Sequence, residues 1–311
     1  MSHIQYDREA YLGIHVSKAA IRRLSAKDPR VSMAKVAAYF VLIVAFCALY
    51  ALTDNSLVRA SCVIMLGLVY AHGVELQHEA LHGNLFRRPV VNRVVGFLTG
   101  APMLVSFTQY RAYHLHHHRC VGTSNDEELF DYTARSLRNP LSVFVRMWNL
   151  IKIPAFLVTF LGMLQGDYPD KVRPTERRSL LVECSLLFAM LALALGSPFF
   201  LGDHLLMLWI VPWLAIAEPH HFLVEVPEHI GCDRRDRSIL KNTRSYTTNP
   251  CWAYLTNFNN FHIEHHLFPT VPAHRLGVLH ARTRVAQGHC TDGYWKALKE
   301  VSTTVRNDSE R

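Results

Sequence analysis

Four apolar stretches constrain the fold of this chain more than any other feature of its sequence. A helix that crosses the hydrocarbon core of a bilayer needs about 20 mostly apolar residues. The stretches that approach this length are Val36–Leu52, Ala60–Gln77, Cys184–Leu201 and His204–Ala217. The last is short unless its helix continues into the polar segment that follows. The composition agrees with a membrane protein, since 50% of the residues are apolar and only 19% are charged.

Short connections join these stretches in pairs. Thr53–Arg59 separates the first two and Gly202–Asp203 the last two, so each pair is predicted to form a helical hairpin. Two hairpins place both ends of the chain on one side of the membrane. Lys and Arg accumulate in loops that stay in the cytoplasm, and here they are concentrated in the N-terminal, middle and C-terminal segments. These three segments are therefore expected on the cytoplasmic side.

Two weaker apolar stretches, Val90–Phe107 and Ile151–Leu164, are expected to be interfacial or re-entrant helices. Each would otherwise cross the membrane alone and separate the histidine clusters described below. The expected fold is an all-α integral membrane protein with four transmembrane helices in two hairpins and a cytosolic helical cap. Its divisions are a cytosolic N-terminal segment (1–35), one membrane domain (36–300) and a short, disordered C-terminal tail (301–311).

Charge and cysteine content exclude several other classes of protein. The net charge of +8 does not indicate a nucleic-acid binder, because the basic residues lie beside apolar stretches and form no stripe with interleaved aromatic residues. The seven cysteines lie far apart without a CxxC pair. They are expected to be reduced, and they do not predict an iron–sulfur cluster or a structural zinc site. The polar N-terminus does not resemble a cleavable signal peptide.

Histidine is the unusual residue, with 19 in the chain. The first cluster is His78-Glu79-Ala80-Leu81-His82, in which a separation of four places both rings on one helical face. The second is His114-Leu115-His116-His117-His118, and the third, His262-Ile263-Glu264-His265-His266, repeats the same HxxHH spacing. An adjacent pair that diverges can serve two metals. One HxxxH pair alone is usually accidental, but three clusters on the same predicted side of a membrane indicate a function.

This order of HxxxH, HxxHH and HxxHH, together with two apolar hairpins, resembles the membrane-bound fatty acid desaturase and hydroxylase superfamily. The most specific stretch is Asn259 to Pro272, which is similar to the last histidine box of that family. The resemblance implies two non-haem irons and, as their ligands, His78, His82, His114, His117, His118, His262, His265 and His266. It also implies one further ligand between the second and third boxes, for which His229 is the candidate.

The segment around His229 leaves alternatives open. Glu225 stands where the family commonly has asparagine, and it could ligate directly, through water or not at all. His220 and His221 could compete with His229, or could support the ligands or line a substrate pocket.

Other polar residues near the boxes have milder interpretations. His116 is expected to point away from the metals, while His72 and Glu75 could orient ligands or simply end the second apolar stretch. The acidic loop Asn125–Glu128 is expected to be solvated, with orientation of ligands as the alternative. Three further histidines are expected on the surface: His274, His280 and His289.

The resemblance implies an oxygen-dependent desaturase that introduces a double bond into an acyl chain or related lipid. Within the superfamily the alternative is a hydroxylase or monooxygenase. From other classes, a non-catalytic membrane metal-binding or transport protein would place its ligands inside the bilayer, and a haem protein would place paired histidines on facing helices. The expected partners are a lipid or acyl substrate, O2, the membrane and an external electron donor of the ferredoxin or cytochrome type, with no nucleic acid.

Overall fold

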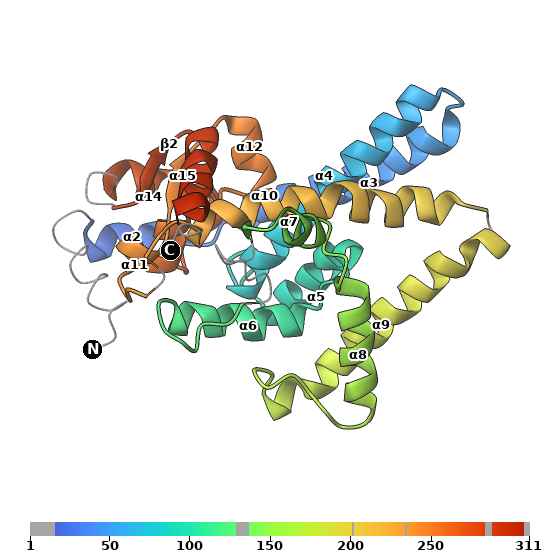
Figure 1. Cartoon of the computed structure of the whole chain (residues 1–311), viewed down its shortest axis with the longest axis horizontal. Helices are drawn as coiled ribbons and strands as arrows, with labels where there is room; N and C mark the ends of the chain where they lie inside the picture. Colours follow the sequence, from blue (N-terminus) through green and yellow to red (C-terminus); the bar gives the residue numbers. More distant parts are fainter. Residues whose placement is uncertain (1–15, 129–136, 201, 234, 284–287, 308–311) are drawn as a thin grey trace.

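The computed structural model describes residues 16–128, 137–200, 202–233, 235–283 and 288–307, and these residues are mostly helical (Figure 1). The all-α class expected from the sequence is confirmed, apart from one short pair of parallel strands. The elements of the first two thirds are α2 (Lys18–Leu24), α3 (Pro29–Leu52), α4 (Ser56–Leu81), α5 (Pro89–Gly100), η1 (Ala101–Met103), α6 (Phe107–Cys120), α7 (Pro140–Met147), α8 (Lys152–Leu164), η3 (Pro174–Glu176), α9 (Arg177–Gly196) and η4 (Ser197–Phe199).

The remaining elements carry the last two histidine-containing segments. They are the π-helical turns η5 (Leu206–Ile210) and η6 (Pro212–Ala217), followed by α10 (Glu218–His229), α11 (Ile239–Asn242), β1 (Ser245–Thr247), α12 (Pro250–Leu255), α13 (His262–Leu267), η7 (Ala273–Arg275), α14 (Leu276–Thr283), β2 (Cys290–Asp292) and α15 (Tyr294–Asn307).

Four segments among the described residues are long and apolar enough to cross a membrane: Pro29–Leu52, Ser56–Leu81, Pro174–Phe199 and Leu206–His229. They contain the four stretches predicted from the sequence, except that His204 and Leu205 lie just before the fourth and the third ends at Phe199. Two bent helix pairs, α5–η1 with α6 and α7 with α8, raise the number to six if each pair is one span; their bends are 98° and 61°.

Local capping explains where the first two long helices begin. The Asp28 side chain accepts hydrogen bonds from the backbone N–H groups of Arg30 and Val31 at the start of α3, and Asn55 caps α4 in the same way. Many large apolar side chains on these helices remain exposed, including Val41, Val44 and Leu52. An apolar surface of this extent is expected where helices face lipid rather than water.

The inner faces of the long helices pack into one core. Buried residues of α4, η1, α6, α9 and η6 belong to this core, and its Trp213 is fully buried. Gly67 allows α4 to approach η6 closely, since a Cβ atom there would lie 2.4 Å from Cβ of Ile216. The tips of α3 and α4 project from one end of the molecule, while α2, α11 and α14 gather at the opposite end (Figure 1).

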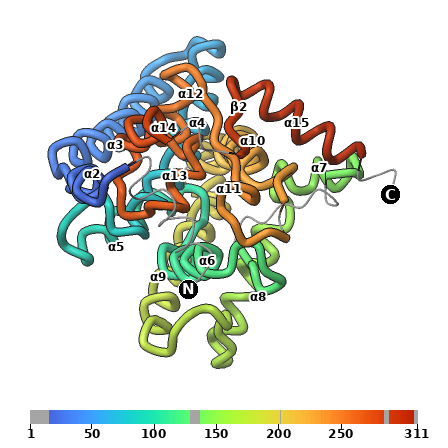
Figure 2. The backbone as a smooth tube through the Cα atoms, turned by 90° about the vertical axis from the view of Figure 1, so that its left-hand side faces the viewer, coloured from blue at the N-terminus to red at the C-terminus, as the bar shows by residue number. Residues whose placement is uncertain are grey.

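The C-terminal elements fold back over the end of α4 that carries the first histidine box. The α15 helix packs near α7 and α10 (Figure 2), with Val301 buried against Phe222 and Val226. The chain is therefore helical through Asn307, and the prediction that it becomes disordered at Val301 is wrong. Among these C-terminal elements, strands β1 and β2 pair in parallel, with Ser245 opposite Cys290.

Candidate metal centre

The first histidine box lies at the inner end of α4. All residues from Val69 to Leu81 are buried, and the helix ends at His82 because Gly83 adopts a left-handed conformation with φ of 73°. The four-residue spacing places the rings of His78 and His82 on one face, with their centroids 5.2 Å apart.

The second box occupies the C-terminal half of α6, whose start is anchored by a buried carboxylate of α9. Glu183 accepts hydrogen bonds from Ser106 Oγ at 2.7 Å, Thr108 N at 2.8 Å and Thr108 Oγ1 at 2.7 Å. A carboxylate at a helix N-terminus is stabilised by the unpaired N–H groups there. This anchor fixes α6 across the end of α4, so that His114 reaches the first box.

The third box forms the short helix α13. Its Glu264 points away from the histidines and accepts hydrogen bonds from Ser245 Oγ at 2.6 Å and His280 Nδ1 at 2.7 Å. Ser245 Oγ also accepts the backbone N–H of Ile263 at 3.0 Å. The single acidic residue of the third box therefore holds the helix in place from behind.

Five histidines from three segments converge on one point. Their Nε2 atoms make contacts of 2.9 Å (His78–His114, His82–His114 and His114–His118) and 3.0 Å (His78–His265 and His118–His265). One ligand atom from each of the five lies within 4.8 Å of every other. The group that could hold a first metal ion is His78, His82, His114, His118 and His265.

A second group adjoins the first. His117, His229 and His266 offer ligand atoms within 4.8 Å of one another, and His229 also belongs to a group with Glu228 and His262. The two groups meet where the rings of His118 and His266 stack at 4.2 Å. The adjacent pairs 117/118 and 265/266 thus each give one ring to each group. Eight of the nine histidines singled out from the sequence lie in these two groups, and the ninth, His262, joins the second group through its shared neighbour His229.

The donor set of the five-histidine group fits a bound cation. Glu128 Oε1 lies 2.5 Å from Nδ1 of His114 and accepts a hydrogen bond from its N–H, which leaves a single lone pair on Nε2. Three other ring nitrogens lie 2.9 Å from that atom, and one lone pair can accept only one hydrogen bond. A ring of such nitrogens is therefore explained by a cation at its centre, and imidazole suits iron, zinc, copper and nickel.

The electrostatics of the third box also favour metal binding. Burial lowers the pKa values of His262, His265 and His266 well below the ordinary value of histidine, and the neighbouring imidazoles lower them further. These rings are therefore neutral at neutral pH, which is the form that ligates metals.

The acidic loop after α6 holds the ligands of the second box. Asp126 Oδ1 lies 2.7 Å from Nδ1 of His117, and Glu128 bridges Nδ1 of His114 and Nε2 of His117, the latter at 3.2 Å. Glu127, between them, is 56% exposed. The expectation of a solvated loop is wrong for Asp126 and Glu128, and the alternative, that the loop orients ligands, describes them correctly.

The residues that competed with His229 lie elsewhere. His221 and Glu225 form a separate buried group with Glu75, at Nε2-to-oxygen distances of 3.5 and 3.8 Å. His220 packs its ring on Trp252. In this segment of the chain, the carboxylate that approaches the second group is Glu228, whose Oε2 lies 3.3 Å from Nε2 of His262. Its position next to His229 in the sequence was the signal that could have identified it.

Among the remaining histidines, His116 lies outside both groups and contacts the carbonyl of Asn125 at 2.8 Å. His72 bonds the carbonyl of Leu255 and stacks on Tyr254. The prediction that His280 lies on the surface is wrong, because it is 5% exposed and bonded to Glu264. That role depends on the packing of α14 against α13, which no local pattern in the sequence reveals.

Comparison with known proteins identifies a family whose model covers all three histidine boxes. The family model described as "Fatty acid desaturase" matches residues 54–295. Among curated relatives, the chloroplastic omega-3 fatty acid desaturase of Glycine max is 26% identical over 273 residues, which are 80% of this chain and 59% of that protein.

Two further relatives differ in what their names specify. The sn-2 acyl-lipid omega-3 desaturase (ferredoxin) of Helianthus annuus is 25% identical over 285 residues, 83% of this chain and 63% of its own length. Dihydrorhizobitoxine desaturase of Bradyrhizobium elkanii is 25% identical over 275 residues, 84% of this chain and 78% of its own length. The chain thus spans about three fifths of the two plant relatives.

Proposed function

This chain belongs to the fatty acid desaturase family, and we propose that it is an oxygen-dependent, membrane-bound di-iron desaturase that introduces a double bond into an acyl chain of a lipid. The observation that carries this proposal is the convergence of nine histidines from four separate segments on two adjoining groups. A transport pathway would distribute its ligands along the bilayer, whereas these groups adjoin each other at the ends of the long helices.

In this proposal the first iron is held by His78, His82, His114, His118 and His265, and the second by His117, His229, His262 and His266 with Glu228 beside them. The irons, together with O2, supply the oxidising power for breaking an unactivated C–H bond, which no side chain can supply. Asp126 and Glu128 hold the Nδ1 protons of His117 and His114, so that Nε2 of each ring is the metal-facing atom. Six of the nine histidines are buried, which limits the access of water to the site.

The proposed topology is two transmembrane hairpins with both termini and the histidine boxes in the cytoplasm. The four long apolar segments support it, since only three residues separate α3 from α4 and six separate η4 from η5 in the numbering of the chain. The last long segment ends at His229, and the third box follows it in the sequence. Both therefore lie on the same side of the membrane as the end of α4. The bent pairs are then re-entrant or interfacial helices.

The proposed substrate is an acyl lipid, and the proposed electron donor is a separate ferredoxin or cytochrome. The names of the plant relatives support both, one of them specifying ferredoxin. A basic surface next to the second box suits an acidic donor: Arg119 in the last turn of α6 and Arg235 and Arg237 in a later loop are exposed. The end of α6 and that loop meet where Gly122 approaches the backbone of Asp236.

Metal analysis and lipid analysis test this function together. We expect the purified protein to contain about two irons per chain and no haem absorption, and cells that produce it to contain lipids with new double bonds. His265→Ala should lose iron and the lipid products, whereas His116→Ala, a matched change in a histidine outside both groups, should retain them. Zinc without iron, haem, or hydroxylated lipids in place of alkenes would each contradict the proposal.

A further inference from the structure

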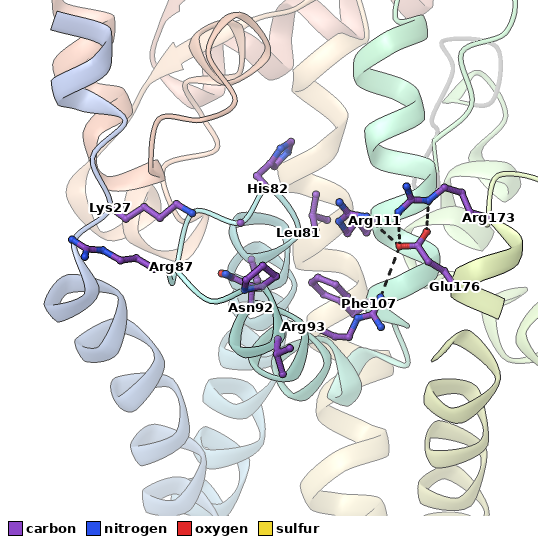
Figure 3. Close-up of a pocket in the computed structure, with 14 residues that line it drawn as sticks. Lys27, Leu81, His82, Arg87, Asn92, Arg93, Phe107, Arg111, Arg173 and Glu176 are labelled. Atoms are coloured by element: carbon purple, nitrogen blue, oxygen red, sulfur yellow. Dashed lines mark hydrogen bonds and ion pairs between the residues drawn. The ribbon is translucent and has the colours of Figure 1, made fainter. Parts of the chain in front are cut away.

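A basic cavity lies directly outside the first histidine box. Its volume is about 430 Å³, within the range of ~300–1,000 Å³ that is typical of small-molecule sites. It lies between the connection from α2 to α3, the end of α4, α5, α6 and η3, and its lining includes His82 of the five-histidine group (Figure 3). The cavity therefore adjoins the candidate metal centre.

The charge of the lining is strongly unbalanced. Five cationic side chains and one carboxylate line the cavity, which leaves a formal excess of four positive charges; the cations are Lys27, Arg87, Arg93, Arg111 and Arg173. The carboxylate, Glu176, is already shared by three of them, with Arg173 at 3.0 Å, Arg111 at 3.4 Å and Arg93 at 3.8 Å.

The cations on the other side of the cavity have no such partner. Figure 3 shows Lys27 and Arg87 together, across from Arg111, Arg173 and Glu176. Lys27 donates to the carbonyl of Phe86 at 3.5 Å, and within the described part of the chain no carboxylate forms an ion pair with Lys27 or Arg87. Cations held around one cavity repel one another unless an anion enters it, and guanidinium groups match the oxygens of phosphate.

The surroundings indicate that the anion belongs to a lipid. Pro89 and Val90 line the cavity at the start of α5, and Val90, Val94 and Leu98 follow one face of that helix, 72%, 51% and 46% exposed. A spacing of four residues makes this face a continuous apolar strip. A phosphate held in the cavity would thus have its apolar chains alongside a surface suited to lipid tails.

We propose that this cavity binds the phosphate of a phospholipid head group, so that the acyl substrate is recognised as a phospholipid. The inference that the bound phospholipid is the substrate rests on the proposed desaturase function. Binding of the phospholipid can be measured without turnover. Arg87 and Lys27 contact the phosphate from one side, while Arg111 and Arg93 contact it from the other, oriented by Glu176.

Calorimetric titration of the full-length protein in detergent tests the proposal with three probes: dihexanoyl phosphatidic acid, dihexanoylglycerol and inorganic phosphate. The first should bind at least tenfold more tightly than the second, which has the same chains without the charge. Arg87→Gln should weaken its binding by about tenfold or more, because a charge-assisted hydrogen bond is lost, and Arg87→Lys should weaken it less. Arg59→Gln, in the first turn of α4 and outside the cavity, should have no effect.

Equal binding of phosphatidic acid by wild type and Arg87→Gln would overturn the proposal. Inorganic phosphate that binds as tightly as the lipid would overturn the assignment to a head group. Arg87 is exposed and its substitution removes no ion pair described above, so misfolding does not explain a loss. The His265→Ala variant separates the two proposals: it should abolish desaturation and retain binding. A wild type that binds phosphatidic acid through Arg87 and produces no double bonds would contradict the proposed function alone.

Discussion

Nδ1 of His117 lies 2.7 Å from Oδ1 of Asp126, on the loop that immediately follows the second histidine box. A carboxylate in this position fixes the orientation of the ring and raises the basicity of the opposite nitrogen. The loop therefore belongs functionally to the box that it follows, although it contains no histidine.

Asp126→Asn is expected to weaken metal binding. Removal of a carboxylate behind a histidine ligand typically costs ~10–100-fold in metal affinity. Iron retained after dialysis against graded chelator concentrations measures this loss. Glu127→Gln is the matched control, because Glu127 is exposed and bonds no histidine. Equal retention of iron by both variants would show that Asp126 does not support His117.

The buried pair His280–Glu264 is expected to make stability depend on pH. Burial acts to lower the pKa of His280, but hydrogen bonds to Cys290 and Glu264, together with the charge of Glu264, outweigh it and raise the pKa to about 9. Because this exceeds the ordinary value of ~6.5, the stabilisation is fully present below pH ~6.5 and is lost as the pH rises through about 9.

Thermal unfolding in detergent at pH 6, 7.5 and 9.5 checks this expectation. The melting temperature of wild type should fall toward pH 9.5, and His280→Gln should be less stable at pH 6 with a smaller fall. His274→Gln, on the neighbouring η7 and without that pair, serves as the control. A wild-type melting temperature that is constant to pH 9.5 would contradict the linkage.

Gly73→Ala is expected to destabilise the protein through the packing of α4 against α5. A Cβ atom at Gly73 would lie 2.3 Å from the carbonyl oxygen of Thr99, which is backbone and cannot rotate away. Overpacking of this kind typically costs ~1–3 kcal/mol in the free energy of unfolding. Gly196→Ala is the control, since nothing lies within 4 Å of a Cβ atom there. Chemical unfolding of both variants in mixed micelles should separate them; similar midpoints would mean that α5 adjusts freely.

Glu218→Gln is expected to destabilise the junction between η6 and α8. The Glu218 side chain is 3% exposed, accepts a hydrogen bond from Trp213 Nε1 at 2.6 Å and pairs with Lys152. Neutralising one member of a buried ion pair leaves the other charge unpaired and costs ~3–5 kcal/mol in the free energy of unfolding. The double variant Lys152→Met/Glu218→Gln should recover much of that loss, because no charge is left unpaired. Unfolding midpoints of the two variants decide this, and a double variant as unstable as Glu218→Gln would refute the explanation.

Much of the fold could be predicted because apolar length determines where helices can cross a membrane. The ends of those helices could not be predicted as well, since they depend on polar residues outside the apolar runs. Asp28 and Pro29 start α3 seven residues before Val36. The fourth segment continues through Glu218 to His229 because its polar face is buried against other helices.

The candidate site could be predicted to the extent that spacing determines which rings share a helical face. All nine histidines come together, and the division of each adjacent pair between two groups follows from the angle between successive residues on a helix. Asp126, Glu128, Glu228 and His280 were missed or misjudged because their roles arise from contacts between separate elements. Loop residues follow no regular spacing, so the sequence does not show whether a carboxylate in a loop supports a metal ligand or is exposed to water.

The contact between His78 and His265 joins residues 187 positions apart. Neither histidine group is complete until α13 has been synthesised. Under the proposed di-iron function, iron loading is therefore a late step in biogenesis, and a chain that terminates before residue 262 is expected to fail to retain iron.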